Sequence, residues 1–289
     1  MIRFLLPEVT IVLAERSPAY LEASQAVSQQ LAGRANVTVT QAEGAERLPP
    51  REPAVVVALG TRALRAVLAN GTRAPVIATL IPRSAFESEL KGFSRQNDSK
   101  GVTAVFLDQP FERQLNLVRI VAPGKTRVGV LASPATQDAV QRIESAARER
   151  GLSIVGESVD DAQRISTALA RLLGESELLL ALPDPSIFNA STIHNILLSA
   201  LRAQQPLIGF SEAYVRAGAL AAVYSKPRQV GHQAGEIAAQ TVAGAPLPPP
   251  QYPKSFSVSV NPTVARTLGL AVEEEAALAA KLQRMEREP

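Results

Sequence analysis

The 289-residue sequence contains no cysteine and no tryptophan, two histidines, and few aromatic residues of any kind (4%). A chain without cysteine has no disulfide framework, no thiolate zinc site, no cysteine nucleophile and no lipidated N-terminal cysteine. His194 and His232 both fall in segments with a helical pattern, where packing or surface roles are the usual ones. Neither is accompanied by a GxxxxGK[ST], a strand-linked GxGxxG, an HExxH or a GxSxG motif. We therefore expect no enzyme, no metal site and no cofactor.

Long apolar runs are also missing, since no stretch approaches the roughly 20 residues that span a bilayer. The first residues, MIRFLLPEVTIVLAERS, do not form a signal peptide: Pro7 and Glu8 interrupt the apolar run and no small-residue cleavage site follows. The sequence leaves two alternatives open, a cytoplasmic protein or an exported one whose signal has been removed. In either case we expect no direct insertion into a membrane.

An excess of charge of one sign is missing as well. The formal net charge is +3, and the positive residues are scattered among acids. The isoelectric point near 9.4 reflects arginine, which stays protonated at high pH. No lysine or arginine cluster is interleaved with aromatic residues, so we expect no nucleic-acid partner.

What the sequence does contain is a regular alternation of short β-branched apolar runs and amphipathic segments of helical length. Runs such as VVVAL and LLLAL are apolar throughout, which is typical of parallel strands covered by helices on both faces. The predicted strands are 9–15, 37–41, 54–59, 75–80, 127–132, 152–157, 178–182, 206–210 and 219–224. The predicted helices are 18–32, 61–70, 111–121, 137–150, 165–173, 191–204, 229–243 and 262–268. This order indicates an α/β fold with parallel sheets and right-handed crossovers.

The two sets of strands resemble each other. VVVALGT leads through a helix into APVIATLI, and LLLALPD leads through a helix into QPLIGFSE. We interpret this as two similar doubly wound lobes, although any α/β protein yields some echoes of this kind. The late strand and helix after residue 210 predict that the lobes are discontinuous. One comprises residues 1–105 and 223–255, and the other residues 106–222 and 256–289.

Three further segments connect or close these lobes. Residues 86–100 are polar and are expected to form a surface loop leading to the first crossover. The stretch APLPPPQYP is expected to be an extended connector. The tail 272–287 is expected to be a solvated closing helix, with acids at its start and bases late.

Ligands of open parallel sheets bind beyond the carboxyl ends of the strands, so the loops that follow the predicted strands form the candidate site. Gly60 permits close backbone approach, and Thr61 is suited to cap the next helix and leave N–H groups aimed at an anion. Ser17 and Ser133 are suited to similar roles, and Asp184 to accepting hydrogen bonds from an ammonium group. The predicted apolar walls are Tyr20, Phe188, Phe210 and Tyr214. Each of these residues also has an ordinary interpretation as a cap, a turn residue or a core aromatic.

The order of these features resembles the uncharacterised ABC-transporter substrate-binding family of type I periplasmic binding proteins, whose relatives take up aromatic amino acids. The matching stretches run from about Ala54 to Leu270 and include VVVALGTRAL, LLLALPDPSIFN, QQPLIGFSEAYVRAGALAAVYS and SFSVSVNPTVARTLGL. The resemblance implies a periplasmic protein that binds a small-molecule ligand between two lobes and delivers it to the membrane permease of an ABC transporter. It places the ligand-facing loops on Gly60, Thr61, Ser133, Pro134, Asp184 and Ser211.

The sequence departs from the family after its fourth strand, where Arg83 stands in place of an acidic turn residue. A guanidinium there is suited to a bidentate grip on a carboxylate, and with Asp184 opposite, a zwitterion such as an amino acid fits both. The ordinary alternative is that Arg83 points to solvent and Asp184 caps a helix. The predicted ligand-binding set is Ser17, Gly60, Thr61, Arg83, Ser133, Asp184, Ser211 and Tyr214. The alternative function is a ligand-sensing receptor module that does not transport.

Overall fold

The computed structural model describes residues 6–43, 52–93 and 101–287. The chain divides into two compact units, each discontinuous in sequence. Unit 1 comprises Met1–Asp108 and Ser225–Ser255, and unit 2 comprises Gln109–Tyr224 and Phe256–Pro289. The chain therefore passes from one unit to the other three times. The sequence analysis places these passages after residues 105, 222 and 255.

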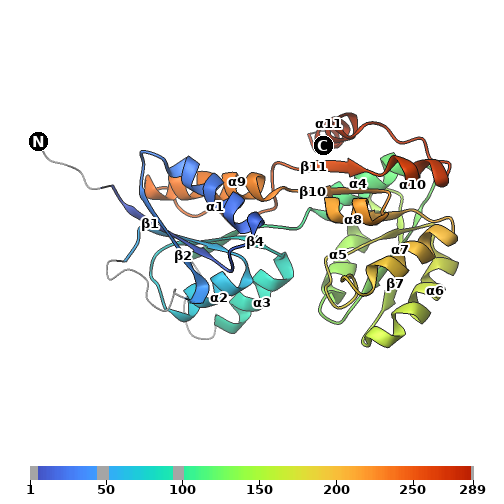
Figure 1. Ribbon diagram of the computed structural model, residues 1–289, viewed down its shortest axis with the longest axis horizontal. Coiled ribbons are helices and arrows are strands. Elements are labelled where there is room, and N and C mark those ends of the chain that lie inside the picture. Colours follow the sequence, from blue (N-terminus) through green and yellow to red (C-terminus); the bar gives the residue numbers. More distant parts are fainter. Residues whose placement is uncertain (1–5, 44–51, 94–100, 288–289) are drawn as a thin grey trace, which may run out of the picture. The chain divides into compact units, whose positions relative to one another are not determined.

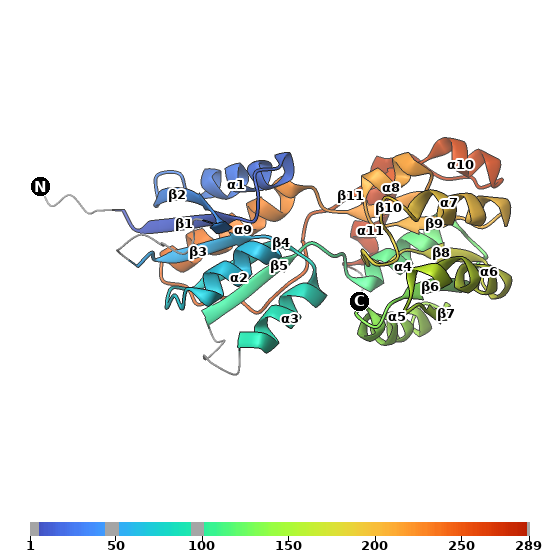
Figure 2. The same cartoon turned by 60° about the horizontal axis from the view of Figure 1, so that its bottom comes forward.

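Unit 1 is built on a parallel sheet whose two faces are covered by helices, α1 and α9 on one side and α2 and α3 on the other (Figure 1). The sheet has five strands in the order β2-β1-β3-β4-β5 (Figure 2). For this reason β3, with the sequence VVVAL, has all five side chains buried. Its strands are β1 (Glu8–Leu13), β2 (Asn36–Gln41), β3 (Val55–Leu59), β4 (Val76–Ile81) and β5 (Val102–Phe106), and its helices are α1 (Pro18–Leu31), α2 (Thr61–Ala69), α3 (Arg83–Phe93) and α9 (Pro227–Val242).

Helices α1 and α9 approach each other closely at two glycines of α9. A Cβ atom added at Gly231 would lie 2.4 Å from the carbonyl oxygen of Ala23, and one added at Gly235 would lie 2.8 Å from Cβ of Gln30. Both distances are shorter than van der Waals contact. The two glycines stand four residues apart on one face of α9, and they let the helix that returns late in the sequence pack directly on the first one.

Helix α3 occupies part of the segment where the sequence analysis expects a surface loop, so that expectation is wrong for residues 86–93. The polar composition hides a short apolar stripe: Phe86 is buried, and Leu90, four residues later, packs against the same core cluster. That spacing places both on one helical face. Residues 94–100 of the expected loop lie outside the described residues. Strand β5 follows at Val102, and the sequence analysis does not identify it.

The proline-rich connector, residues 245–253, runs beside β5. Gln251 forms an isolated parallel bridge with Val105, and the hydroxyl of Thr103 donates to the carbonyl of Pro248 at 2.6 Å. The ring of Tyr252 meets that of Phe106 edge to face, with centroids 5.4 Å apart. The stretch thus shields the outer edge of the sheet of unit 1.

Unit 2 has a six-stranded sheet in the order β7-β6-β8-β9-β10-β11 (Figure 2). The first five strands are parallel and repeat the order of unit 1, but β11 is antiparallel to β10, which the sequence analysis does not anticipate. Its strands are β6 (Arg127–Ala132), β7 (Ser153–Ser158), β8 (Leu178–Leu180), β9 (Leu207–Gly209), β10 (Ala221–Tyr224) and β11 (Ser257–Val260). Its helices are α4 (Phe111–Val121), α5 (Gln137–Arg148), α6 (Ile165–Glu175), α7 (Ile193–Arg202), α8 (Glu212–Ala217), α10 (Pro262–Thr267) and α11 (Glu275–Met285). The predicted α/β fold with two parallel-dominated sheets is confirmed.

The closing helix α11 is part of the core, so the expectation of a solvated tail is wrong. Leu278 and Leu282, one turn apart, are both fully buried in the cluster that also holds α4 and α5. Near the end of the chain, Glu286 accepts hydrogen bonds from the guanidinium of Arg113, whose Cζ atom lies 4.2 Å from the ring centroid of Phe256. The abundant charges of the tail occupy its outer face and conceal this apolar stripe.

Candidate strand-end binding sites

In a doubly wound sheet the favoured ligand position lies at the carboxyl ends of the strands, where the strand order reverses. In unit 1 this reversal falls between β1 and β3, because β2 lies on one side of β1 and all later strands lie on the other. In unit 2 the corresponding reversal falls between β6 and β8. We call these two places switch point 1 and switch point 2. Ser17, Gly60 and Thr61 follow the strands of switch point 1, and Ser133 and Asp184 follow those of switch point 2.

At switch point 1, Ser17 precedes α1 and Gly60 precedes α2. Ser17 is the N-cap residue, but its hydroxyl makes no capping hydrogen bond. The N-cap of α2 is Gly60, with φ +93° and ψ 163°, a conformation that residues with a side chain rarely adopt. The expectation that Thr61 caps this helix is therefore wrong: Thr61 is the first helical residue.

Tyr20 of α1 lies over Gly60. Its hydroxyl oxygen is 2.7 Å, and a carbon of its ring 2.8 Å, from the position that a Cβ atom at residue 60 would take. A side chain at this position would therefore displace the ring. Burial, and then the negative charge of Glu15, raise the pKa of Tyr20, while the positive charge of Arg62 acts in the opposite sense. Both residues belong to loops that follow predicted strands, but the sequence analysis assigns neither of them a role.

Arg83, at the first position of α3, is held inside unit 1. Its Nε donates to Glu87 at 2.7 Å and its guanidinium donates to the hydroxyl of Tyr252 at 3.0 Å. Its Cζ lies 5.8 Å from the Tyr252 ring centroid and 5.9 Å from that of Phe106. The backbone N–H of Arg83 donates to Asp108, the last residue of this part of unit 1. Its guanidinium therefore joins α3 to the proline-rich stretch, and the sequence offers no signal for Tyr252 as its partner.

At switch point 2, the buried carboxylate of Asp184 joins the two loops. One oxygen accepts from the backbone N–H of Ser133 at 3.1 Å and from the hydroxyl of Thr136 at 2.7 Å. The other accepts from the backbone N–H and the hydroxyl of Ser186, at 3.0 and 2.6 Å. These four donors match the roughly four lone-pair positions of a carboxylate. Sequence analysis singles out neither Thr136 nor Ser186 as a polar partner, although both belong to its candidate loops.

The protonation of Asp184 follows from this setting. Burial by itself would raise its pKa, but the hydrogen bonds from Ser186, Ser133 and Thr136 outweigh burial and leave the pKa below the ordinary aspartate value. Asp184 is therefore ionised at neutral pH. Its 2% exposure leaves almost no surface for a second partner.

Next to switch point 2, three aromatic rings gather after β8 and β9. Phe210 and Tyr214 have centroids 4.3 Å apart, and Phe188 meets both rings at about 6.5 Å. The Tyr214 hydroxyl donates to the backbone carbonyl of Phe188 at 2.9 Å, which fixes the ring. Tyr214 lies in helix α8 and not in a loop as expected, and Ser211 caps that helix without a side-chain hydrogen bond. Phe210 and Tyr214 remain partly exposed and offer an apolar surface.

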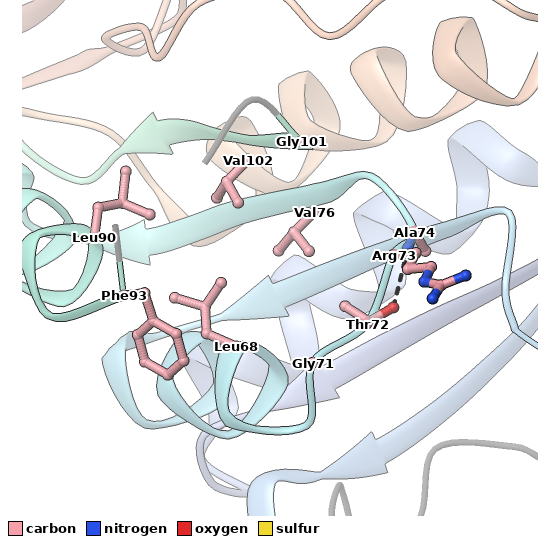
Figure 3. A pocket seen from close by; sticks show the side chains of 10 residues that line it. All are labelled: Leu68, Gly71, Thr72, Arg73, Ala74, Val76, Leu90, Phe93, Gly101 and Val102. Atoms are coloured by element: carbon pink, nitrogen blue, oxygen red, sulfur yellow. Dashed lines mark hydrogen bonds between the residues drawn. The ribbon is translucent and has the colours of Figure 1, made fainter. Parts of the chain in front are cut away.

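A further hollow of about 540 Å³ lies in unit 1 at the opposite, amino ends of β4 and β5 (Figure 3). Leu68, Val76 and Phe93 give it an apolar wall, and Arg73 lies at its rim. Two of its lining residues, Phe93 and Gly101, stand on either side in sequence of residues 94–100, which lie outside the described part of the chain. By the strand-end rule it is not the place where a doubly wound sheet binds its ligand.

In the part of the chain that the structure describes, no group of three or more histidine, cysteine, aspartate or glutamate residues could hold a metal ion. His194 and His232 are both exposed. Between residues 6 and 287, gaps excepted, no helix is long and apolar enough to cross a bilayer.

Comparisons with known proteins give a consistent result. The profile of the family described as ABC transporter substrate binding protein matches residues 26–283. A tyrosine-binding protein of Clostridioides difficile (strain R20291) is 21% identical over 193 residues, which is 66% of this chain and 55% of that protein. The chain thus matches about half the length of this curated relative.

Two solved structures show the same fold. The ABC domain from Streptococcus pneumonia in complex with L-Trp is 18% identical with a TM-score of 0.64, over 95% of this chain and 98% of that one. The ligand-free, open structure of a substrate-binding protein with adhesive properties from Clostridium difficile is 16% identical with a TM-score of 0.74, over 93% and 96% of the two chains. Since the family profile covers most of its length, the chain belongs to the ABC transporter substrate-binding protein family.

Proposed function

We propose that this protein binds an amino acid outside the cytoplasm and delivers it to the permease of an ABC transporter. The single observation that carries the solute-binding role is the match of the family profile to residues 26–283. The strand order of each of the two sheets is consistent with it, since each sheet contains one switch point. Family members bind substrates and do not catalyse reactions. Export to the periplasm and the permease partner follow from that family role.

The choice of an amino acid rests on relatives and on the aromatic cluster. One relative is named for tyrosine and one solved neighbour holds L-Trp, whereas others of the same fold hold sugars such as myo-inositol. Phe188, Phe210 and Tyr214 place apolar ring surface beside switch point 2, where a large side chain would find a wall. The ligand set Ser17, Gly60, Thr61, Arg83, Ser133, Asp184, Ser211 and Tyr214 stays a prediction.

Isothermal titration calorimetry of the full chain tests this function. The probes are L-tyrosine, L-tryptophan and L-leucine, with D-ribose and myo-inositol as the sugar arm. We expect an aromatic amino acid to bind with a micromolar or tighter Kd and to raise the melting temperature, since it binds the folded state alone. Binding of a sugar and of no amino acid would replace the proposed ligand class. Mass spectrometry should recover the bound solute unchanged, and a product would contradict a purely binding role.

The second candidate function is ligand sensing without transport. The observation that favours it is a solved transcriptional regulator of the LacI type, from Lactobacillus brevis, that shares the fold. Deletion of the gene separates the two functions. Loss of uptake of the radiolabelled solute identified by calorimetry supports transport, whereas unchanged uptake with an altered transcriptional response supports sensing.

A further inference from the structure

The charged residues at the strand ends differ in whether their side chains already have hydrogen-bond or ion-pair partners within the protein. Asp184 accepts four hydrogen bonds from Ser133, Thr136 and Ser186, so all of its lone-pair positions are occupied. A ligand ammonium that approached it would have to displace a protein donor from a site that is 2% exposed. The carboxylate of Asp184 therefore holds two loops of the protein together by hydrogen bonds.

Arg83 and Arg62 at the strand ends of unit 1 are engaged as well. Arg83 pairs with Glu87 and donates to Tyr252, and Arg62 pairs with Glu43 at 2.6 Å. The Arg62 pair is exposed on both sides and contributes little to stability. It still supplies each charge with an opposite partner.

Glu15 is in a different situation. It follows β1 directly, at the carboxyl end where the strand order reverses, and its side chain is exposed. Within residues 6–43, 52–93 and 101–287 it forms no ion pair and no side-chain hydrogen bond. Glu15 stands in the connection between β1 and α1, and Tyr20, whose ring covers Gly60, stands in the first turn of α1, so both belong to switch point 1. Burial and then the negative charge of Glu15 raise the pKa of Tyr20.

We propose that Glu15 and Tyr20 form the subsite that receives the protonated amine of the ligand at switch point 1, in the place that sequence reasoning gives to Asp184. A carboxylate without a partner forms a charge-assisted hydrogen bond with an ammonium group, and the face of a tyrosine ring attracts the same cation. Gly60 is required because any side chain there would displace Tyr20. This proposal rests on the proposed function, since it names the residues that recognise the amine of an amino acid.

Calorimetry with paired probes tests the subsite. Each of L-tyrosine and L-tryptophan is compared with its analogue that lacks the amine, 3-(4-hydroxyphenyl)propionate and indole-3-propionate. Glu15→Gln should weaken binding of the amino acids at least tenfold, which corresponds to about 1.4 kcal/mol, and should change binding of the analogues less than twofold. Glu15→Asp should restore part of the loss. The matched control is Glu22→Gln, which removes an exposed carboxylate from α1 two residues after Tyr20, where helix geometry turns the side chain away from that ring, and should leave both probes unaffected.

The outcomes separate the subsite from the wider function. If Glu15→Gln binds the amino acids as tightly as the wild type, or loses amino acids and analogues equally, the subsite is wrong while the transport role stands. If the wild type binds sugars alone, the amine subsite is likewise wrong, with solute binding intact. If the wild type binds none of the probes, the proposed amino-acid function fails and takes the subsite with it. Asp184→Asn should lower the melting temperature and weaken both members of each probe pair alike, because it loosens loops without removing an amine contact.

Discussion

The two switch points have the same strand order but differ in how their polar side chains are hydrogen-bonded. β2-β1-β3-β4-β5 in unit 1 corresponds to β7-β6-β8-β9-β10 in unit 2. In unit 2 a buried aspartate ties the loops after β6 and β8 together with four hydrogen bonds. In unit 1 the loops after β1 and β3 have no such bridge: a glycine backbone and a tyrosine ring meet there, beside an exposed glutamate.

This difference shows that a repeated fold need not repeat its site. Switch point 2 has satisfied its own polar groups, so it offers a ligand fixed shape and aromatic surface. Among the described residues, switch point 1 keeps polar groups without a side-chain partner: the hydroxyl of Ser17 makes no capping hydrogen bond and the carboxylate of Glu15 is exposed. These groups lie where ligand contacts are expected.

The largest expected effect concerns the close packing of α9 on α1 in unit 1, which depends on glycine. Gly231→Val places a branched side chain where even Cβ would lie 2.4 Å from the carbonyl oxygen of Ala23. Helices α1 and α9 must separate, and we expect a loss of about 3 kcal/mol in the free energy of unfolding, measured by urea denaturation. Gly174→Ala in α6 of unit 2 is the control. Its added Cβ meets nothing within 4 Å, so stability should stay the same or rise by up to about 1 kcal/mol. If Gly231→Val lowers the free energy of unfolding no more than Gly174→Ala does, α9 tolerates separation from α1.

Removing one carboxylate from each switch point tests the comparison directly. Asp184→Ala leaves buried donors of Ser133, Thr136 and Ser186 without their acceptor, and we expect a loss of about 2–3 kcal/mol. Glu15→Ala removes an exposed group that makes no ion pair with any described residue, and its effect on unfolding should stay within about 0.5 kcal/mol. Chemical denaturation of both variants at pH 7 is the measurement. A loss in Glu15→Ala as large as that in Asp184→Ala would mean that switch point 1 is bridged as well.

The pH dependence of stability should carry the same asymmetry. The pKa of Asp184 in the folded protein lies below its unfolded value of about 3.9, so its contribution is fully present above that pH. The contribution is lost as the pH falls below about 4 toward the folded-state pKa. Denaturation midpoints of wild type and Asp184→Asn should therefore converge in acid and differ most at pH 5–7. A difference that stays constant down to pH 2 would rule out an ionised Asp184 as the source of the stabilisation.

The smallest effect concerns helix caps. Asn261 in unit 2 accepts from the backbone N–H groups of Thr263 and Val264 at 3.1 Å, so Asn261→Ala should lower the free energy of unfolding by about 1–2 kcal/mol. Ser17 in unit 1 stands at the same kind of position without a capping bond, and Ser17→Ala should have almost no effect. A loss near 1 kcal/mol in Ser17→Ala, measured by thermal and urea unfolding, would show that its hydroxyl caps α1 in solution.

Much of the fold could be predicted from periodicity. Continuous apolar runs such as VVVAL predict strands covered on both faces, and the structure confirms this for β3. The predictions fail for helices in which charged residues outnumber the few apolar residues that face the core. In α3 the buried Phe86 and the partly buried Leu90, and in α11 the buried Leu278 and Leu282, dock a helix that is rich in charged residues. Composition averaged over such a segment indicates solvent, although two side chains one turn apart are enough to dock it.

For the candidate site, the sequence predicted which loops lie at the strand ends but not which of their side chains are available to a ligand. The strand-end rule brings Gly60, Ser133 and Asp184 to the switch points because parallel strands all end at the same edge. Whether a side chain there is available to a ligand depends on what lies across the loop. Asp184 and Arg83 both have the right charge for a zwitterion, yet both already have partners within the protein. Thr136 and Ser186 donate hydrogen bonds to Asp184, and Arg83 donates one to Tyr252. These partners lie 2 to 169 residues away in sequence.

By itself the sequence determined the α/β class, the alternation of strands and helices and which loops lie at the carboxyl ends of the strands, because these depend on local periodicity and on the rule that parallel strands end together. Only the tertiary structure decided that α9 returns to pack on α1 through Gly231, that the proline-rich stretch shields β5, and that Asp184 is saturated while Glu15 is not. The physical reason is that a charge or a close helix contact acquires its role from groups brought near it by folding, and a linear pattern records the group without recording its partner.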